Sequence, residues 1–238
     1  MEKELAYLRR YYKGNVDEAI SRLKKGEPVQ YIVGNVNFYG YELMVNKDVL
    51  IPRRETEELT EEVIRRMKVF SNPVIADVAT GSGAIAITLS KELNVSLYAS
   101  DISEKALLVA EKNAFDNQAS VTFFQGDMLK PFIDNNVKLD VIVSNPPYIK
   151  ENEEIEPVVF NNEPHLALFA KDGGLEFYQK IFMDAKKVLN DKFLIALEIG
   201  ESQGKSVADL AKSYLGDVTV EIKKDLSQKN RMVFVYNY

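Results

Sequence analysis

The spacing of apolar residues changes along the chain, and these changes divide it into segments. Apolar residues recur every three or four positions over residues 2–25, which predicts one or two short helices. From Pro28 to Pro52 they alternate with other residues around Gly34 and Gly40, which predicts a β-hairpin. Helical spacing returns over Glu55–Phe70. The predicted division is a helical N-terminal segment (1–27), a β-hairpin linker (28–54) and a larger domain (55–238).

Short apolar runs then alternate with amphipathic stretches. This pattern predicts βαβ units, a mostly parallel sheet and an α/β fold. The last two runs are joined by a short polar stretch, which predicts an antiparallel pair at the sheet edge. The predicted strands are Val74–Val78, Leu97–Asp101, Val121–Gln125, Leu139–Ser144, Phe193–Glu198, Val218–Ile222 and Met232–Tyr236, and the predicted helices are Ala84–Leu93, Glu104–Asn113, Leu175–Leu189 and Ser202–Tyr214.

The composition limits which catalytic and metal-binding groups the chain can supply. The 238 residues include no cysteine, which excludes disulfides, cysteine nucleophiles and thiolate metal sites. The single histidine, His165, is expected to be a loop residue, and no metal site is predicted. A net charge of −6 is a poor match to a protein that grips long nucleic acid. The charged N-terminus and the lack of a long apolar run predict a cytoplasmic protein without a membrane span.

A glycine-rich loop follows the first predicted strand of the larger domain. Glycines there allow a ligand to approach the backbone, and the next helix offers free N–H groups. Asp101 ends the following strand, where a carboxylate can accept hydrogen bonds from both hydroxyls of a ribose. The alternative is a tight turn, with Asp101 as a helix cap. Since Ala84 stands where a phosphate loop has lysine, we expect a nucleoside cofactor without pyrophosphate. The candidate cofactor residues are Asp77, Ala79, Thr80, Gly81, Ser82, Gly83, Asp101 and Ile102.

Gly126-Asp127-Met128 follows the third strand of this domain. Asp127 could accept a hydrogen bond from an exocyclic amino group such as adenine N6, and Met128 could pack on the ring. The alternative is an acidic residue in an ordinary turn.

Asn145-Pro146-Pro147-Tyr148 follows the fourth strand of this domain. Ligands of open α/β sheets bind beyond the carboxyl ends of the strands. The prolines hold the backbone rigid, Asn145 offers an amide, and Tyr148 offers an aromatic face. Together they predict a clamp for a planar NH₂ group, with a proline-rich strand end as the alternative.

These motifs resemble those of class I S-adenosylmethionine methyltransferases that act on amino nitrogens. The chain is also similar to the HemK/PrmC family, whose members methylate N5 of a glutamine in peptide chain release factors. The residues that carry this likeness are 28–34, 38–40, 49–57, 172–175, 198–200, Gln203 and the stretch from Lys224 to Arg231. In two positions the chain departs from the family: Ala79 replaces a loop glycine, and Arg54 replaces proline.

The resemblance implies a fold and a reaction. The fold is a seven-stranded mixed sheet in the order 3-2-1-4-5-7-6, with strand seven antiparallel. The reaction is methyl transfer from S-adenosylmethionine to a glutamine amide, leaving S-adenosylhomocysteine. Phe38 and Leu50–Arg53 should lie near the cofactor or acceptor. The resemblance assigns catalysis to Asn145, Pro146 and Tyr148. It assigns binding of the acceptor to the same three residues and to Pro147 and Arg53. It also assigns cofactor binding to Asn145.

The expected partner is a release factor with a Gly-Gly-Gln loop, and the expected state is a monomer with no stable nucleic-acid binding. Two alternatives stay open. Adenine-N6 methyltransferases of DNA or RNA share the clamp motif, although the charge and the predicted hairpin count against them. A protein that binds the cofactor without catalysis is the other alternative, with Ala79 as its only indication.

Overall fold

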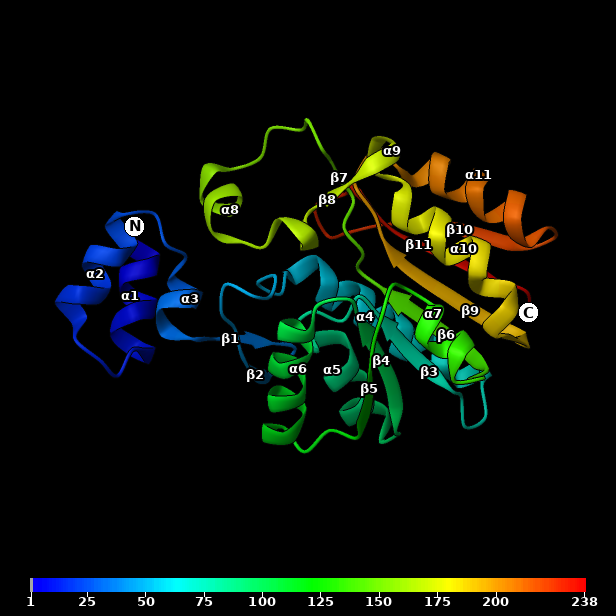
Figure 1. Cartoon of the computed structure of the whole chain (residues 1–238), viewed down its shortest axis with the longest axis horizontal. Coiled ribbons are helices and arrows are strands. Elements are labelled where there is room, and N and C mark those ends of the chain that lie inside the picture. The colour runs from blue at the N-terminus through cyan, green and yellow to red at the C-terminus, as the bar shows by residue number, and fades with distance from the viewer. Residues whose placement is uncertain (1) are drawn as a thin grey trace.

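The computed structural model describes residues 2–238. Figure 1 shows the three N-terminal helices at one end, followed by a small hairpin and then a large sheet flanked by helices. Within the described residues, no helix has the length and apolar character needed to cross a membrane.

Three helices begin the chain: α1 (Glu2–Tyr11), α2 (Val16–Lys24) and α3 (Val29–Val33). Asn15 caps α2, because its Oδ1 accepts hydrogen bonds from the backbone N–H groups of Asp17 and Glu18. The helices share a small core of Leu8, Ala19, Leu23, Val29 and Ile32. The predicted helical N-terminus is therefore present.

The prediction of β-structure is wrong over residues 29–33, which form α3. Val29 and Ile32 are three positions apart and both buried, so one helical face carries them. Gly34 ends the helix in the left-handed conformation, with φ of 85°. A short apolar run is compatible with the periodicity of a helix and with that of a strand. Packing against α1 and α2 selected the helix.

The hairpin consists of β1 (Asn35–Phe38) and β2 (Tyr41–Met44), which pair antiparallel. Tyr39 and Gly40 form its two-residue turn with φ of 51° and 89°, as a type I′ turn requires. Phe38 is 1% exposed and packs against α5 and α6. Phe38 was expected near the cofactor or acceptor, but it lines neither cavity described below and instead supports these helices.

The sheet has the expected topology. Across the sheet the order is β5-β4-β3-β6-β9-β11-β10, which is 3-2-1-4-5-7-6 when β3 is counted as strand one. β11 runs in the direction opposite to the other six strands of this sheet, as expected for strand seven. The seven strands are β3 (Ile75–Val78), β4 (Leu97–Asp101), β5 (Val121–Gln125), β6 (Leu139–Ser144), β9 (Leu189–Glu198), β10 (Thr219–Lys224) and β11 (Asn230–Tyr236).

Helices cover both faces of the sheet (Figure 1). On one face lie α4 (Arg54–Arg66), extended by a 3₁₀ turn (Met67–Val69), then α5 (Ala84–Leu93) and α6 (Glu104–Asp116). On the other lie α7 (Lys130–Asp134), α10 (Glu176–Val188) and α11 (Gly204–Leu215). The central strands alternate their side chains between the two apolar cores, as Ile142 and Val143 on β6 illustrate.

An irregular segment between β6 and α10 passes over the carboxyl ends of the strands. Glu163 ties it to the linker, since its carboxylate accepts hydrogen bonds from Arg53 and from the backbone N–H of Ile51. Asn162 Nδ2 donates to the Gly26 carbonyl, which links the segment to the N-terminal helices. The segment comprises β7 (Ile149–Lys150), α8 (Pro157–Asn162), a 3₁₀ turn (His165–Ala167), β8 (Phe169–Ala170) and α9 (Lys171–Gly174).

Candidate functional site

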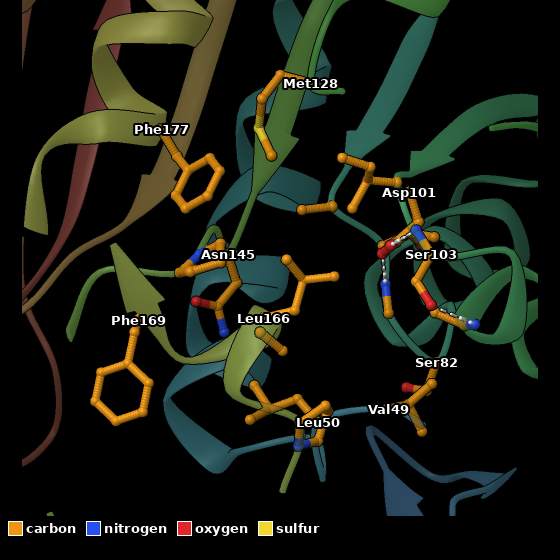
Figure 2. A pocket seen from close by; sticks show the side chains of 18 of the residues that line it. Val49, Leu50, Ser82, Asp101, Ser103, Met128, Asn145, Leu166, Phe169 and Phe177 are labelled. Carbon is orange, nitrogen blue, oxygen red and sulfur yellow. Dashed lines mark hydrogen bonds between the residues drawn. The ribbon is translucent and has the colours of Figure 1, made fainter. Parts of the chain in front are cut away.

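Two cavities of about 390 Å³ each lie at the carboxyl ends of the strands, and Asn145 borders both. Leu50 and Ala167 complete the wall that the two cavities share. Figure 2 shows the first cavity, in which Asn145 and Asp101 face each other from opposite sides. Because Asn145 borders both cavities, its side chain can contact a ligand in each and hold one reactant against the other.

The glycine loop and the turns after neighbouring strands line the first cavity. All but two of the predicted cofactor residues are found there. The lining includes Ala79, Thr80, Gly81, Ser82, Asp101, Ile102, Asp127, Met128 and Asn145. The two that do not line it, Asp77 and Gly83, lie beneath the loop. A Cβ on Gly83 would come within 3.2 Å of Ala110 Cβ, so this glycine permits close packing of α5 on α6.

The backbone of the loop is held in the left-handed region. Ala79 has φ of 58° and Gly81 has φ of 55°. Glycine adopts this conformation at lower cost than alanine, so the departure at Ala79 carries some backbone strain. The first cavity nevertheless stays open beside Ala79.

Asp77 organises the loop from below. Its Oδ2 accepts hydrogen bonds from Thr80 Oγ1 (2.5 Å) and from the Ala86 backbone N–H (3.1 Å). Its Oδ1 is buried and has no hydrogen-bond partner among the described residues. Complete burial raises the pKa of Asp77 to about 7.

We expect Asp77→Asn to remove part of the pH dependence of stability. The folded pKa lies above the ordinary value, so between about pH 4 and pH 7 the folded protein holds a proton that the unfolded chain has lost. Stability from this group is therefore fully present below about pH 4 and falls, by up to about 4 kcal/mol in total, as the pH rises from about 4 to about 7. Urea unfolding of both proteins at pH 5 and pH 8 measures the effect. If Asp77→Asn lost as much free energy of unfolding between pH 5 and pH 8 as the wild type, Asp77 would not titrate in this range.

Asp101 supports the loop and the start of α6 through backbone hydrogen bonds, but it is not the helix cap that was its predicted alternative role. Its Oδ2 accepts a hydrogen bond from Gly81 N–H and its Oδ1 from Ser103 N–H, both at 2.9 Å. The cap of α6 is Ser103 itself, whose Oγ accepts from Ala106 N–H. Burial raises the pKa of Asp101, while the backbone N–H groups oppose this shift. Each carboxylate oxygen has a second lone pair, so Asp101 can still accept hydrogen bonds from a ligand.

Asp127 is paired with Lys180 of α10, at 3.1 Å between Oδ2 and Nζ. Lys180 also approaches Glu176 Oε1 at 3.1 Å and lines the first cavity. This lysine was not predicted, since it lies 53 residues further along the chain. Met128 lies at the edge of the same cavity (Figure 2).

The residues predicted to bind the acceptor divide between the cavities. Pro146, Tyr148 and Arg53 line the second cavity, whereas Pro147 lines the first. Arg53 is held by its ion pair with Glu163, whose side chain is 2% exposed. His165 lines neither cavity, and its Nε2 is 2.7 Å from the Phe160 carbonyl oxygen.

The side chains at these cavities that sequence reasoning missed include Thr56, Leu166 and Phe177. Thr56 occurs in a stretch that carries the family likeness, but nothing in its local pattern marks it as part of a site. Leu166 and Phe177 come from the irregular segment and α10, whose positions over the site depend on tertiary contacts.

The charges around the first cavity suit a cation. Five acidic residues line it, Asp48, Asp101, Asp127, Glu151 and Glu176, against two lysines, Lys171 and Lys180. This environment fits the sulfonium and ammonium groups of S-adenosylmethionine and disfavours a pyrophosphate. Over residues 2–238, no group of three or more His, Asp or Glu side chains is arranged to hold a metal ion.

Known proteins are similar to this chain in sequence and fold. Residues 54–208 match the family model of the methyltransferase small domain. A release factor glutamine methyltransferase from Bacillus subtilis is 46% identical over 88% of this chain and 75% of its own length. One from Bacillus anthracis is 43% identical over 91% of this chain and 79% of its length. A release factor-specific protein-(glutamine-N5) methyltransferase from Alicyclobacillus acidocaldarius superposes with a TM-score of 0.53 at 29% identity, covering 82% of this chain and 99% of that one.

Proposed function

The chain belongs to the family of release factor glutamine methyltransferases, and from this we propose that it methylates the side-chain amide N5 of a glutamine in a peptide chain release factor. S-adenosylmethionine supplies the methyl group from its sulfonium. The observation that carries the proposal is the position of Asn145, which borders both the acidic first cavity and the second cavity. We assign the cofactor to the first cavity and the glutamine to the second.

An amide nitrogen is a weak nucleophile, because its lone pair is delocalised into the carbonyl. In our proposal Asn145 Oδ1 and the Pro146 carbonyl oxygen accept its two N–H bonds. These contacts aim the nitrogen at the methyl group and support the positive charge that develops on it. The Tyr148 ring holds the plane of the amide. No strong base is required, since the N-methylated amide cation readily loses its proton.

The loop residues and the acids of the first cavity hold the cofactor in this proposal. Asp101 accepts hydrogen bonds from the ribose hydroxyls and Asp127 from an adenine amino group, while Met128 packs on the ring. The Ala79–Gly83 backbone lies along the amino-acid part of the cofactor. Asp77 acts on this part by holding the loop in place through Thr80 and the Ala86 N–H.

The acceptor in this proposal is the glutamine of a Gly-Gly-Gln loop. Flanking glycines let a protein loop approach closely enough for its glutamine to enter a narrow cavity. A nucleic-acid base would have to be flipped out of its stack, and it would meet Glu154 and Glu156 at the second cavity. We further propose that the enzyme acts as a monomer in the cytoplasm and does not bind nucleic acid stably.

The test is a comparison of acceptors with radiolabelled S-adenosylmethionine. We expect label on a purified release factor, and none on its Gln→Ala loop variant, on DNA or on RNA. Mass spectrometry of the labelled release factor locates the methyl group. Label on nucleic acid, or equal label on the Gln→Ala variant, would overturn the assignment of the acceptor.

A further inference from the structure

A buried chain of hydrogen bonds connects Asn145 to a carboxylate on another strand. Asn145 Nδ2 donates to Thr56 Oγ1 at 3.0 Å. The Thr56 hydroxyl donates to Glu198 Oε2 at 2.7 Å. Thr56 on α4 is 4% exposed and Glu198 at the end of β9 is 1% exposed. Three elements distant in sequence therefore meet directly behind the clamp.

The direction of these bonds determines which end of the Asn145 amide faces the cavities. A hydroxyl has one hydrogen, and Thr56 gives it to the Glu198 carboxylate. The Thr56 oxygen can then only accept, so the Asn145 NH₂ group must point toward it. The amide oxygen of Asn145 is left to accept a hydrogen bond from an acceptor amide. If the amide were reversed, two oxygens without a hydrogen between them would face each other.

Several groups hold Glu198 in place. Its Oε1 accepts from the Tyr148 hydroxyl at 3.3 Å, and its backbone carbonyl accepts from the Tyr178 hydroxyl at 2.9 Å. The positive charge of Arg231 on β11 favours the carboxylate, and the negative charge of Glu55 on α4 opposes it. Both carboxylate oxygens of Glu198 are thus engaged by hydroxyl groups.

We propose that Glu198 is a positioning residue for methyl transfer, acting through Thr56 to orient the Asn145 amide with its oxygen toward the substrate nitrogen. The proposal rests on the proposed function, because it assigns Asn145 to the acceptor amide. Glu198 neither receives a proton from the substrate nor contacts the methyl group in this scheme. Its effect is to keep Asn145 an acceptor rather than a donor.

Protonation of Glu198 should weaken its hold on the orientation of the Asn145 amide. A protonated carboxyl can donate to the Thr56 oxygen, which frees the Thr56 hydrogen for the Asn145 oxygen and favours the reversed amide. Burial raises the pKa of Glu198 to about 7, with Thr56, Arg231 and Tyr148 opposing the shift. The oriented state is therefore present above pH 7 and is lost progressively as the pH falls below it.

The first experiment compares two valine substitutions on the same helix. Thr56→Val removes the hydroxyl that links Glu198 to Asn145, and we expect kcat to fall about tenfold with an unchanged KM for S-adenosylmethionine. Thr56→Ser restores a hydroxyl and should recover most of the loss. The matched control is Thr60→Val, since Thr60 is equally buried one turn away and its hydroxyl donates only to the Thr56 carbonyl.

The second experiment measures the pH profile of methylation. We expect wild-type kcat to decline below about pH 7, and the Glu198→Gln variant to lose this decline because its amide does not titrate there. If Thr56→Val matched Thr60→Val in kcat, or if Glu198→Gln kept the wild-type decline, the positioning role would be wrong while the proposed function stood. A wild-type enzyme that left the release factor unmethylated would contradict both.

Discussion

Replacement of Asn145 by alanine is expected to lower methyl transfer by about a hundredfold or more while leaving cofactor affinity nearly unchanged. The amide oxygen is the group that we assign to the acceptor nitrogen, and its contribution grows as positive charge develops there. The cofactor, in contrast, keeps its contacts with the glycine loop and Asp101 on the opposite side of the cavity. Single-turnover kinetics with a release factor, together with calorimetry for S-adenosylmethionine, measure the two effects separately.

The matched control for this variant is Asn190→Ala. Asn190, near the start of β9, is also half-buried and also donates a hydrogen bond through its Nδ2, in this case to Asp140 Oδ1 on β6. It is remote from both cavities, so the rate of methyl transfer should stay near that of the wild type. If Asn145→Ala kept its activity within a factor of a few, the clamp mechanism would have to be abandoned.

Replacement of Asp101 by alanine is expected to weaken S-adenosylmethionine binding by about ten- to a hundredfold, or roughly 1.5–3 kcal/mol. The variant loses a charged acceptor for the ribose hydroxyls. It also frees the backbone N–H groups of Gly81 and Ser103, which both donate to this carboxylate. Calorimetric titration of the folded variant gives the change in affinity.

Two further variants separate ligand binding from loop support. Asp101→Asn keeps one oxygen for the backbone but removes the charge, so its loss of affinity should be smaller than that of the alanine variant. Glu111→Ala removes one negative charge from an exposed position on α6 and should leave affinity unchanged. Wild-type affinity in a folded Asp101→Ala protein would remove this residue from the cofactor site.

Much of the larger domain could be predicted because its signals are local. The bounds predicted for α5, β4, β5 and β6 agree with the structure residue by residue. Apolar runs end where glycine, proline or an acidic residue follows, and those residues act over a few positions of the chain. The placement of the glycine loop and of Asn145 beyond the strand ends follows from the same local order, since parallel strands present their carboxyl ends at one edge.

Local signals failed where two structures fit the same residues. The run that became α3 satisfies both a helical and an alternating pattern, and contact with α1 and α2 selected the helix. The family resemblance placed Phe38 near the cofactor or acceptor, yet in the fold it packs against α5 and α6 and lines neither cavity.

The sequence by itself determined the strands, the loop chemistry and the residues able to clamp an amide. Only the tertiary structure decided how Asn145 is oriented, because its neighbours come from distant parts of the chain. Thr56 lies 89 residues before Asn145 and 142 residues before Glu198, and Lys180 lies 53 residues after Asp127. No periodicity within a single element specifies such contacts. They form when the helices pack on the sheet and bury polar side chains, each of which then needs a hydrogen-bond partner.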